Sequence, residues 1–383
     1  MRLMPTLTAV LALSLPVLAL GAPAHAAAPT CNGEKATIVG NTRSNDLRGT
    51  PQRDVIWGGE GNDKISGLGG NDLICGGEGS DRIAGGPDND TIYGETDNYR
   101  TDRFGRFKRI GDTIIPGSGD DYVDPGYDAR PTSDGANMVP DTISYVDAPA
   151  PAVTDLRAVP ATVAADGTDT IVIAAGSAIG FVGTPFNDVI RGTYKHDRLF
   201  GMAGDDKITS VAGYDTLLGG AGSDVISSTS INRLAIKAGS GGDTVIVPVP
   251  GEADFNVVGN SGHDKLRMMP FVNPAIFPTM RMDQRKGLTV VTKVQPVAVT
   301  GTFQSFTEVS LPANAKSIYK GTMKGEVIEA NPDFAAIIKA RGGADVITGS
   351  NLKDLLIGGI GFDIGFAKGG KDRCKLIERR QSC

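Results

Sequence analysis

Aspartate recurs at intervals of nine residues in three separate parts of the 383-residue chain. Most of these aspartates are followed two positions later by a branched aliphatic residue, and glycines stand before them, as in Gly58-Gly59-Glu60-Gly61-Asn62-Asp63. The repeated unit is therefore G-G-x-G-x-D-x-U-x, in which U is aliphatic. A short fixed period predicts a fold of stacked units that share one core. The repeat aspartates are Asp54, Asp63, Asp72, Asp81 and Asp90, then Asp188, Asp197, Asp206, Asp215 and Asp224, and then Asp345, Asp354, Asp363 and Asp372.

The two halves of the repeat differ in backbone preference. The glycine-rich half can adopt positive φ and reverse the chain, whereas the three residues after it are extended and point one aliphatic side chain inward. Nine residues then form half a coil, so residue i lies over residue i+18, about 4.8 Å away. With 52 glycines and 6% aromatic residues, the composition also favours turns and short strands. The sequence therefore predicts an all-β fold, a right-handed parallel β-roll or β-solenoid of nonapeptide repeats with irregular insertions. Ile56, Ile74 and Ile92 would stack on one inner wall, facing Ile65 and Ile83 on the other.

The same stacking brings carboxylates together. Two carboxylates about 5 Å apart repel by about 0.8 kcal/mol in water and by about 3 kcal/mol at an effective dielectric constant of roughly 20. A hard divalent cation between adjacent turns would neutralise this charge, and carbonyl groups of the turns would complete the roughly six to eight oxygens that Ca²⁺ prefers. Mg²⁺ fits less well because it demands a tighter octahedron. The stacked pairs are Asp63–Asp81, Asp72–Asp90, Asp188–Asp206, Asp206–Asp224, Asp197–Asp215, Asp345–Asp363 and Asp354–Asp372.

A metal-free solenoid is the alternative reading of these columns. In that case the aspartates would only cap turns, a role that Asn or Ser fills as readily. Because Asp recurs at one fixed position behind the turn glycines, the sequence favours calcium.

At these residues the sequence resembles the RTX family of hemolysin-type calcium-binding repeats. The resemblance implies that several Ca²⁺ ions lie between turns on the same side of the roll, each held by aspartates and backbone carbonyls. Asp63 and Asp81 would share one ion with carbonyls near Gly58, Glu60, Gly77 and Gly79. Over all turns the implied ligands are Asp63, Asp72, Asp81, Asp90, Asp188, Asp197, Asp206, Asp215, Asp224, Asp345, Asp354, Asp363 and Asp372, with Gly58, Glu60, Gly67, Gly69, Gly76, Gly77, Gly79, Gly219, Gly220 and Gly358.

Some turns depart from the family pattern. Gly49 to Asp54 reads GTPQRD, Gly192 to Asp197 reads GTYKHD and Gly349 to Asp354 reads GSNLKD. These turns lack the glycines that would supply carbonyl ligands, so the resemblance is weakest there. The two ends of the chain, around Cys31 and Cys374, are similar to secreted calcium-binding proteins of high-GC Gram-positive bacteria.

Four cysteines, Cys31, Cys75, Cys374 and Cys383, lie near the two ends of the chain. Three pairings are possible, and Cys31 with Cys75 and Cys374 with Cys383 is the simplest, because each bridge would then strap one end. A zinc site is the competing interpretation. It is disfavoured because no cysteine has a partner two residues away.

The first 26 residues are predicted to be a signal peptide. An apolar stretch from Leu7 to Leu20 precedes the small-residue sequence Ala24-His25-Ala26, so the mature chain would begin near Ala27. No other apolar run approaches the roughly 18 residues of a membrane helix. We therefore expect a secreted, extracellular protein without a membrane span.

The repeat runs also divide the chain. We expect a signal peptide at 1–26, an N-terminal calcium-binding β-roll at 27–98, an insertion with irregular β coils at 99–180, a second β-roll at 181–268, a degenerate β region at 269–339, and a C-terminal β-roll with a disulfide cap at 340–383.

Catalytic motifs are absent from the sequence. It contains no H-E-x-x-H, no G-x-S-x-G and no EF-hand spacing, and its net charge of -6 gives no global basic surface for nucleic acid. We expect a protein that binds calcium and folds on binding it, without enzyme activity. One alternative is an adhesin-like module whose insertion Tyr99–Ile110, with five basic and three aromatic residues, binds cell-surface glycan or wall polymer. Another is a polysaccharide-active solenoid enzyme.

Overall fold

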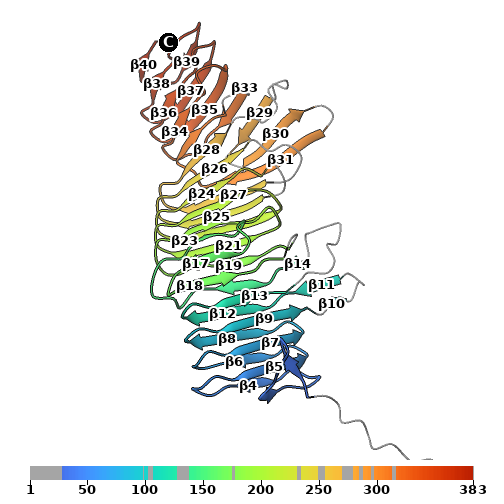
Figure 1. The fold of residues 1–383 in the computed structure, drawn as a ribbon. Helices are drawn as coiled ribbons and strands as arrows, with labels where there is room; N and C mark the ends of the chain where they lie inside the picture. The colour runs from blue at the N-terminus through green and yellow to red at the C-terminus, as the bar shows by residue number, and fades with distance from the viewer. Residues whose placement is uncertain are drawn as a thin grey trace, which may run out of the picture.

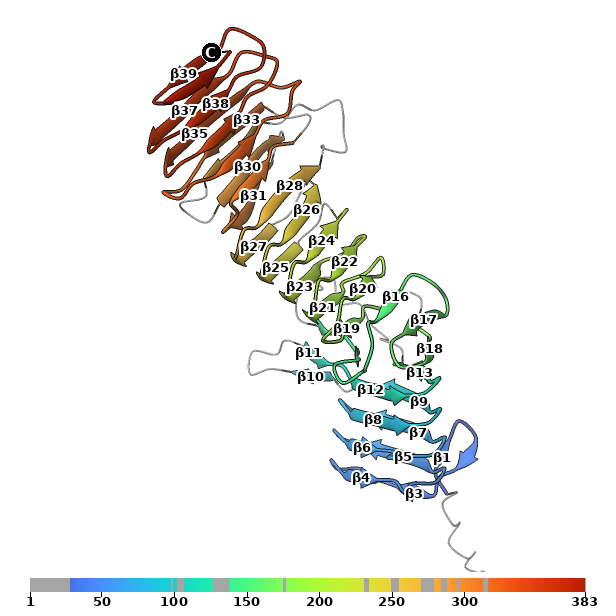
Figure 2. The same cartoon turned by 90° about the vertical axis from the view of Figure 1, so that its left-hand side faces the viewer.

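The computed structural model describes residues 28–97, 99–101, 107–126, 138–174, 177–230, 234–248, 255–269, 279–283, 288–294, 297–312 and 316–382. These residues form strands β1 to β40 and no helix, so none of them could cross a membrane as a helix. Figures 1 and 2 show one elongated stack in which the coils follow each other from the N-terminal strands to the C-terminal ones. The architecture is a parallel β-solenoid, which confirms the predicted fold class.

Long columns of parallel strands run along the stack. The first column contains β3 (Ile38–Val39), β5 (Val55–Glu60), β7 (Leu73–Glu78), β9 (Thr91–Thr96), β13 (Tyr122–Asp124), β18 (Thr168–Ile171), β17 (Ala161–Ala164), β16 (Val153–Asp155), β20 (Val189–Arg191), β22 (Lys207–Ser210), β24 (Val225–Ser228), β26 (Thr244–Pro248), β28 (Lys265–Met269), β32 (Glu308–Ser310), β34 (Val327–Glu329), β36 (Val346–Thr348), β38 (Ile364–Phe366) and β40 (Arg379–Gln381).

The opposite wall is built from two shorter columns. One contains β4 (Asp46–Arg48), β6 (Lys64–Ser66), β8 (Arg82–Pro87), β12 (Thr113–Ser118), β15 (Thr142–Ser144), β19 (Gly180–Val182), β21 (Arg198–Ala203), β23 (Asp215–Ala221), β25 (Leu234–Ser240), β27 (Phe255–Ser261), β31 (Val297–Gln304) and β30 (Leu288–Val294). The C-terminal one contains β29 (Thr279–Asp283), β33 (Lys316–Lys320), β35 (Ala336–Gly342), β37 (Leu355–Ile360) and β39 (Arg373–Lys375). Outside the columns lie β1 (Thr30–Cys31), β2 (Glu34–Lys35), β10 (Tyr99–Thr101), β11 (Phe107–Ile110) and β14 (Met138–Val139).

Strands pair at intervals of 18 residues wherever the repeat is regular. Ile56 pairs with Ile74 and Ile74 with Ile92 in the first column, and Ile65 pairs with Ile83 on the opposite wall. All five side chains are buried, as predicted. Burying one such side chain contributes about 1.5–3 kcal/mol. Each coil therefore draws only a few kcal/mol from its inner walls, and its stability also depends on its turns.

Insertions leave the first column continuous. Val123 of β13 pairs with Ile171 of β18, although the two lie 48 residues apart. Between β18 and β20 the column passes through the antiparallel strands β17 and β16. β32 and β34 carry the same column through the predicted degenerate region 269–339.

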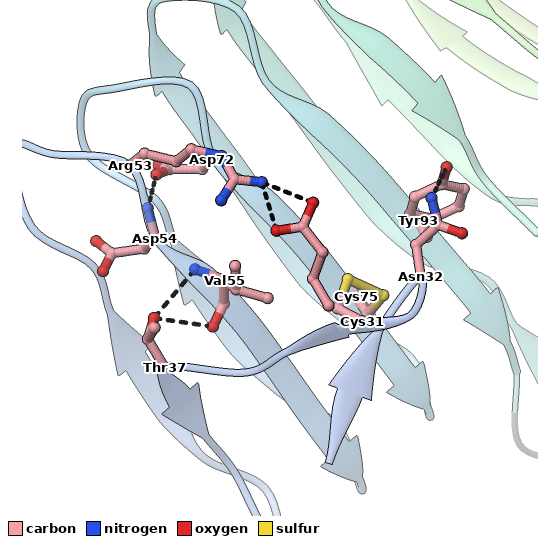
Figure 3. Close-up of polar contacts among 10 residues, drawn as sticks. Cys31, Asn32, Thr37, Arg53, Asp54, Val55, Asp72, Cys75 and Tyr93 are labelled. Atoms are coloured by element: carbon pink, nitrogen blue, oxygen red, sulfur yellow. Dashed lines mark hydrogen bonds and ion pairs between the residues drawn. A yellow bond between two sulfur atoms is a disulfide. The ribbon is translucent and has the colours of Figure 1, made fainter. Parts of the chain in front are cut away.

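A disulfide fastens the N-terminal hairpin to the solenoid. Cys31 of β1 is bonded to Cys75 of β7, with Cα atoms 5.6 Å apart, as predicted. Both cysteines are buried with Val55 and Leu73 in a small cluster separate from the main core. Figure 3 shows this bridge beside the hairpin, where Asn32 Nδ2 also donates a hydrogen bond to the Tyr93 hydroxyl at 2.9 Å.

Two predictions concern residues that the structure does not describe. The pair Cys374–Cys383 stays a prediction because Cys383 lies outside the described residues. The signal peptide at 1–26 and the start of the mature chain near Ala27 also stay predictions, because residues 1–27 lie outside the described residues.

Replacing Ile208 with Ala tests whether the core is confined to the inner walls. Ile208 of β22 is fully buried between Ile190 and Ile226. We expect Ile208→Ala to lower the free energy of unfolding by about 2–5 kcal/mol in urea denaturation, because it leaves a cavity. Val225→Ala on neighbouring β24, where the side chain is 38% exposed, should cost less than about 1 kcal/mol. Equal losses in the two variants would contradict this description of the core.

Candidate metal centres

The repeat aspartates form columns of buried carboxylates along the stack. We number each six-residue turn so that the aspartate is position 6. The backbone N–H of Asp63 donates to Oδ1 of Asp81 at 2.8 Å, and the predicted stacking of these residues is confirmed. The same hydrogen bond, 2.8–3.0 Å long, joins Asp72 to Asp90, Asp188 to Asp206, Asp206 to Asp224, Asp197 to Asp215, Asp345 to Asp363 and Asp354 to Asp372.

Six further aspartates occupy the same columns. The hydrogen bonds run from Asp81 to Asp112 and on to Asp141, from Asp90 to Asp121 and on to Asp169, and from Asp224 to Asp243 and on to Asp264. We did not predict these residues as ligands, because insertions change their spacing to between 19 and 48 residues. The signal that could have found them is the aliphatic residue two positions after each aspartate, which persists where the nine-residue spacing fails.

The second carboxylate oxygen distinguishes the turns. Oδ1 already accepts a hydrogen bond from a backbone N–H of the preceding coil. Only Oδ2 therefore still needs a hydrogen-bond donor or a cation. A buried anionic oxygen without a hydrogen-bond donor is strongly unfavourable, so each such atom calls for a counter-ion. Among the described residues, Oδ2 is buried without any donor in Asp63, Asp72, Asp81, Asp90, Asp121, Asp206, Asp224, Asp243, Asp264, Asp345, Asp363 and Asp372.

Backbone carbonyl groups converge on these oxygens. The space beside the α-carbon of Gly76 shows this. A β-carbon placed there would lie 2.6 Å from Asp81 Oδ2 and 3.0 Å from the carbonyl oxygen of Gly94 in the next coil, so both oxygens border the same small space. At Gly259 the same position lies 2.5 Å from Asp264 Oδ2 and 2.8 Å from the carbonyl oxygen of Ser305. Carboxylate and carbonyl oxygens gathered between two coils are the donors that Ca²⁺ takes. The residues present therefore fit a calcium ion.

The glycines of the turns serve this arrangement. Gly59 and Gly61, at positions 2 and 4, have φ of +107° and +108°, which L-residues rarely adopt. The carbonyl oxygen of Gly76 lies against Gly58 beside Asp63, and that of Gly219 lies against Gly201 beside Asp206. The other predicted carbonyl ligands lie in the same kind of turn, and their role stays a prediction: Glu60, Gly67, Gly69, Gly77, Gly79, Gly220 and Gly358.

Four of the predicted ligands lie in a different environment. In Asp188, Asp197, Asp215 and Asp354 both carboxylate oxygens accept hydrogen bonds from protein groups. In each case a Thr or Ser of the same turn is a donor.

An additional carboxylate joins the columns near the insertion. Oxygens of Asp97, Asp112 and Asp141 lie within 4.8 Å of one another. Asp97 follows β9 and has no place in the nine-residue pattern, so the spacing did not predict it as a ligand.

Burial raises the pKa of several column aspartates. Desolvation is the largest cause at Asp81, whose pKa it raises to about 7, and at Asp90, whose pKa it raises to about 8. Neighbouring carboxylates add to the shift, Asp63 for Asp81 and Asp121 for Asp90. Without a cation, these carboxyl groups would be partly protonated at neutral pH.

A model of the RTX calcium-binding nonapeptide repeat matches this chain in four copies, over residues 39–74, 76–98, 182–217 and 211–230. No curated protein matches the chain. The four copies cover the regular turns of the first two repeat runs, where the stacked carboxylates lie. The chain therefore carries RTX calcium-binding repeats, and it is a calcium-binding repeat protein with a β-solenoid fold.

Acidification should stabilise the metal-free protein. The folded-state pKa values of Asp81 and Asp90 lie above the ordinary aspartate value, so the native state binds more protons than the unfolded state between about pH 4 and 8. Stability in EDTA should therefore fall as pH rises through this window. The measurement is the β-structure content in EDTA, by far-UV circular dichroism, which should be higher at about pH 5.5 than at about pH 8.

Saturating calcium provides the control. Because the cation binds the ionised carboxylates, its presence should abolish or reverse this pH trend. A β-structure content in EDTA that increases with pH would show that the column carboxylates are already stabilised as anions.

Proposed function

We propose that this chain is an exported protein whose glycine-rich coils fold when Ca²⁺ binds between them. The observation that supports this most directly is the set of buried Oδ2 atoms without donors in the described turns. Each of these sites needs two stacked coils, because the carboxylate and the converging carbonyl come from successive coils. The cation would therefore bind the folded state alone, and its binding free energy would add to the stability of the fold.

The donor chemistry favours calcium over other cations. Carboxylate and carbonyl oxygens are hard ligands, which suits Ca²⁺ and Mg²⁺ better than softer metals. A site assembled from two coils has several carbonyls and an adaptable geometry, which suits the larger ion. Mg²⁺ requires a near-ideal octahedron and retains its waters.

Export is supported by the sequence and by the disulfide. The expected signal peptide at 1–26 and the buried Cys31–Cys75 bridge both suit an oxidising compartment. Extracellular calcium modules bind with Kd values of about 10⁻⁴–10⁻³ M. With sites of this strength, the chain would stay extended in a low-calcium cytoplasm and fold outside.

We propose that the protein binds calcium and becomes ordered by it, and that it does not act as a catalyst. The described residues of the basic insertion Tyr99–Ile110 form β10 and β11, an antiparallel pair, and residues 102–106 lie outside the described residues. A glycan or wall-polymer partner at this insertion and a polysaccharide-active enzyme stay alternative hypotheses.

A calcium titration tests this function. Far-UV circular dichroism of the chain from Ala27 onward, in EDTA, should show a large gain of β-structure as CaCl₂ is added, because the counter-ion removes the cost of the buried carboxylates. MgCl₂ at the same concentrations is the control and should produce much less. At about 100 times Kd, each independent site should add about 2.7 kcal/mol. A spectrum already fully β in EDTA and unchanged by calcium would refute calcium-driven folding.

A further inference from the structure

Four of the turns of the second repeat run fall into two kinds. In Gly183–Asp188 the second residue is Thr184, whose N–H donates to Asp188 Oδ2 at 2.7 Å and whose hydroxyl donates to Oδ1 at 2.7 Å. Thr193 makes the same two bonds to Asp197, at 2.6 and 2.8 Å. We call such turns hydroxyl-closed, and those with a buried Oδ2 lacking a donor open. A hydroxyl-closed carboxylate has its donors within the protein.

The backbone separates the two kinds as well. In the open turns that follow, positions 2 and 4 have positive φ: Met202 and Gly204 at +87° and +104°, Gly220 and Gly222 at +125° and +134°. No residue of Gly183–Asp188 or of Gly192–Asp197 has positive φ. The N–H of position 2 reaches the carboxylate only in the turns without positive φ. These four turns thus adopt one arrangement or the other, whereas Ser210–Asp215 combines positive φ at Gly213 with a hydroxyl donor from Ser210.

The coils before these turns need no cation either. Ala152 and Ile179 stand where the repeat would place aspartates, and their N–H groups donate to Asp188 and Asp197. The carboxylate of Asp169 accepts the Tyr145 hydroxyl at 2.6 Å on Oδ2 and the N–H of Asp121 on Oδ1. Thus none of the column carboxylates Asp169, Asp188 and Asp197 has an oxygen without a donor.

This part of the solenoid also has a bulkier core. The Tyr145 ring stacks on Phe181 with centroids 5.5 Å apart, and both side chains are buried with Leu156. Aromatic pairs of this kind add about 0.5–1.5 kcal/mol beyond their buried area. The antiparallel strands β16 to β18 lie in the same part. Asp166, which has one oxygen without a donor, is half-buried and lies outside the carboxylate columns.

We propose that residues 142–199, the central block, fold without calcium and form the platform on which the flanking rolls assemble when calcium binds. The second half of this statement rests on the proposed function. A solenoid is costly to start, because the first coil has no neighbour to stack on, and each later coil adds to a preformed surface. A block that satisfies its own column carboxylates provides that surface before any ion is bound.

The same device stands at the start of the first run and one coil before the third run. Thr50 closes the carboxylate of Asp54 through its N–H and its hydroxyl. Thr322 does the same for Glu326, which also accepts the buried Tyr319 hydroxyl at 3.4 Å. The first and second runs therefore begin on a turn that is complete without a cation, and the third run follows one.

Hydrogen exchange tests the platform directly. In EDTA, peptides from the described residues of 142–199 should exchange at least about ten-fold more slowly than peptides from 201–248, and calcium should protect both. Equally fast exchange of both segments in EDTA would overturn the platform and leave the proposed function standing. Full protection of 201–248 in EDTA would instead refute calcium-driven folding, and the platform with it.

Removing the hydroxyl groups tests their role. The double variant Thr184→Val and Thr193→Val should exchange faster in the block in EDTA, because Val keeps the shape and removes one of the three donors to each carboxylate. The matching variant with Ser at both positions keeps those donors and should retain most of the protection. Thr162→Val, on an exposed position of β17, is the control for the substitution itself. Unchanged protection in the Val variant would contradict the role of these hydroxyls.

Ion counting separates the two kinds of turn. Asp54 and Asp72 are neighbours in one column, joined by the bond from Asp54 N to Asp72 Oδ1, but only Asp72 has an Oδ2 without a donor. Equilibrium dialysis should show fewer bound Ca²⁺ per chain in Asp72→Asn and an unchanged number in Asp54→Asn. The same loss in both variants would overturn the distinction between turns. An absence of bound calcium in the unmodified chain would refute the proposed function itself.

Discussion

The hydrogen bond from the backbone N–H of a column residue to a carboxylate oxygen of the residue one coil later, in most cases from one aspartate to Oδ1 of the next, is the interaction on which the structure depends. It fixes the 18-residue register at the turns, as the strand ladder fixes it on the walls. It also commits one oxygen of every carboxylate and buries the group. The second oxygen must then be satisfied by something other than the neighbouring coil, and this requirement determines both metal binding and folding.

The thin core makes this requirement decisive. The inner walls hold single aliphatic stacks such as Ile190, Ile208 and Ile226. A few kcal/mol per coil from these side chains cannot offset a row of buried, uncompensated anions, since each carboxylate costs an amount of similar size. The fold therefore needs either a cation or a donor within each turn. Some turns of the chain contain the donor and others leave Oδ2 without one, and the two kinds lie at different points along the stack.

The periodic features of this structure could be predicted from the sequence. Spacing alone gave the stacking of Ile56 on Ile74 and of Asp63 on Asp81, because a regular repeat leaves little choice of register. The bridge Cys31–Cys75 followed from position and compartment. Asp243 and Asp264 were not predicted as ligands, because insertions of a few residues hide their spacing while the strands continue to pair.

The closure of turns by hydroxyl groups could not be read from spacing. Thr193 replaces a turn glycine, which in a sequence looks like the loss of a metal ligand. Its actual effect depends on the φ angle at that position and on the direction of one N–H and one hydroxyl. Likewise, nothing in the sequence places the Tyr145 hydroxyl on Asp169, since the two residues meet only after β15 and β18 take their places in opposite walls.

Hydroxyl closure cannot replace cations along the whole stack. A hydroxyl supplies donors but leaves the charge of the carboxylate in place, so closed turns in succession accumulate repulsion. Asp197 and Asp215 show this: both have their oxygens satisfied, yet burial together with the charge of Asp215 still raises the pKa of Asp197 to about 7. A divalent cation removes that charge and joins two coils in doing so. Closed turns are therefore suited to starting a roll, and cation-filled turns to extending it.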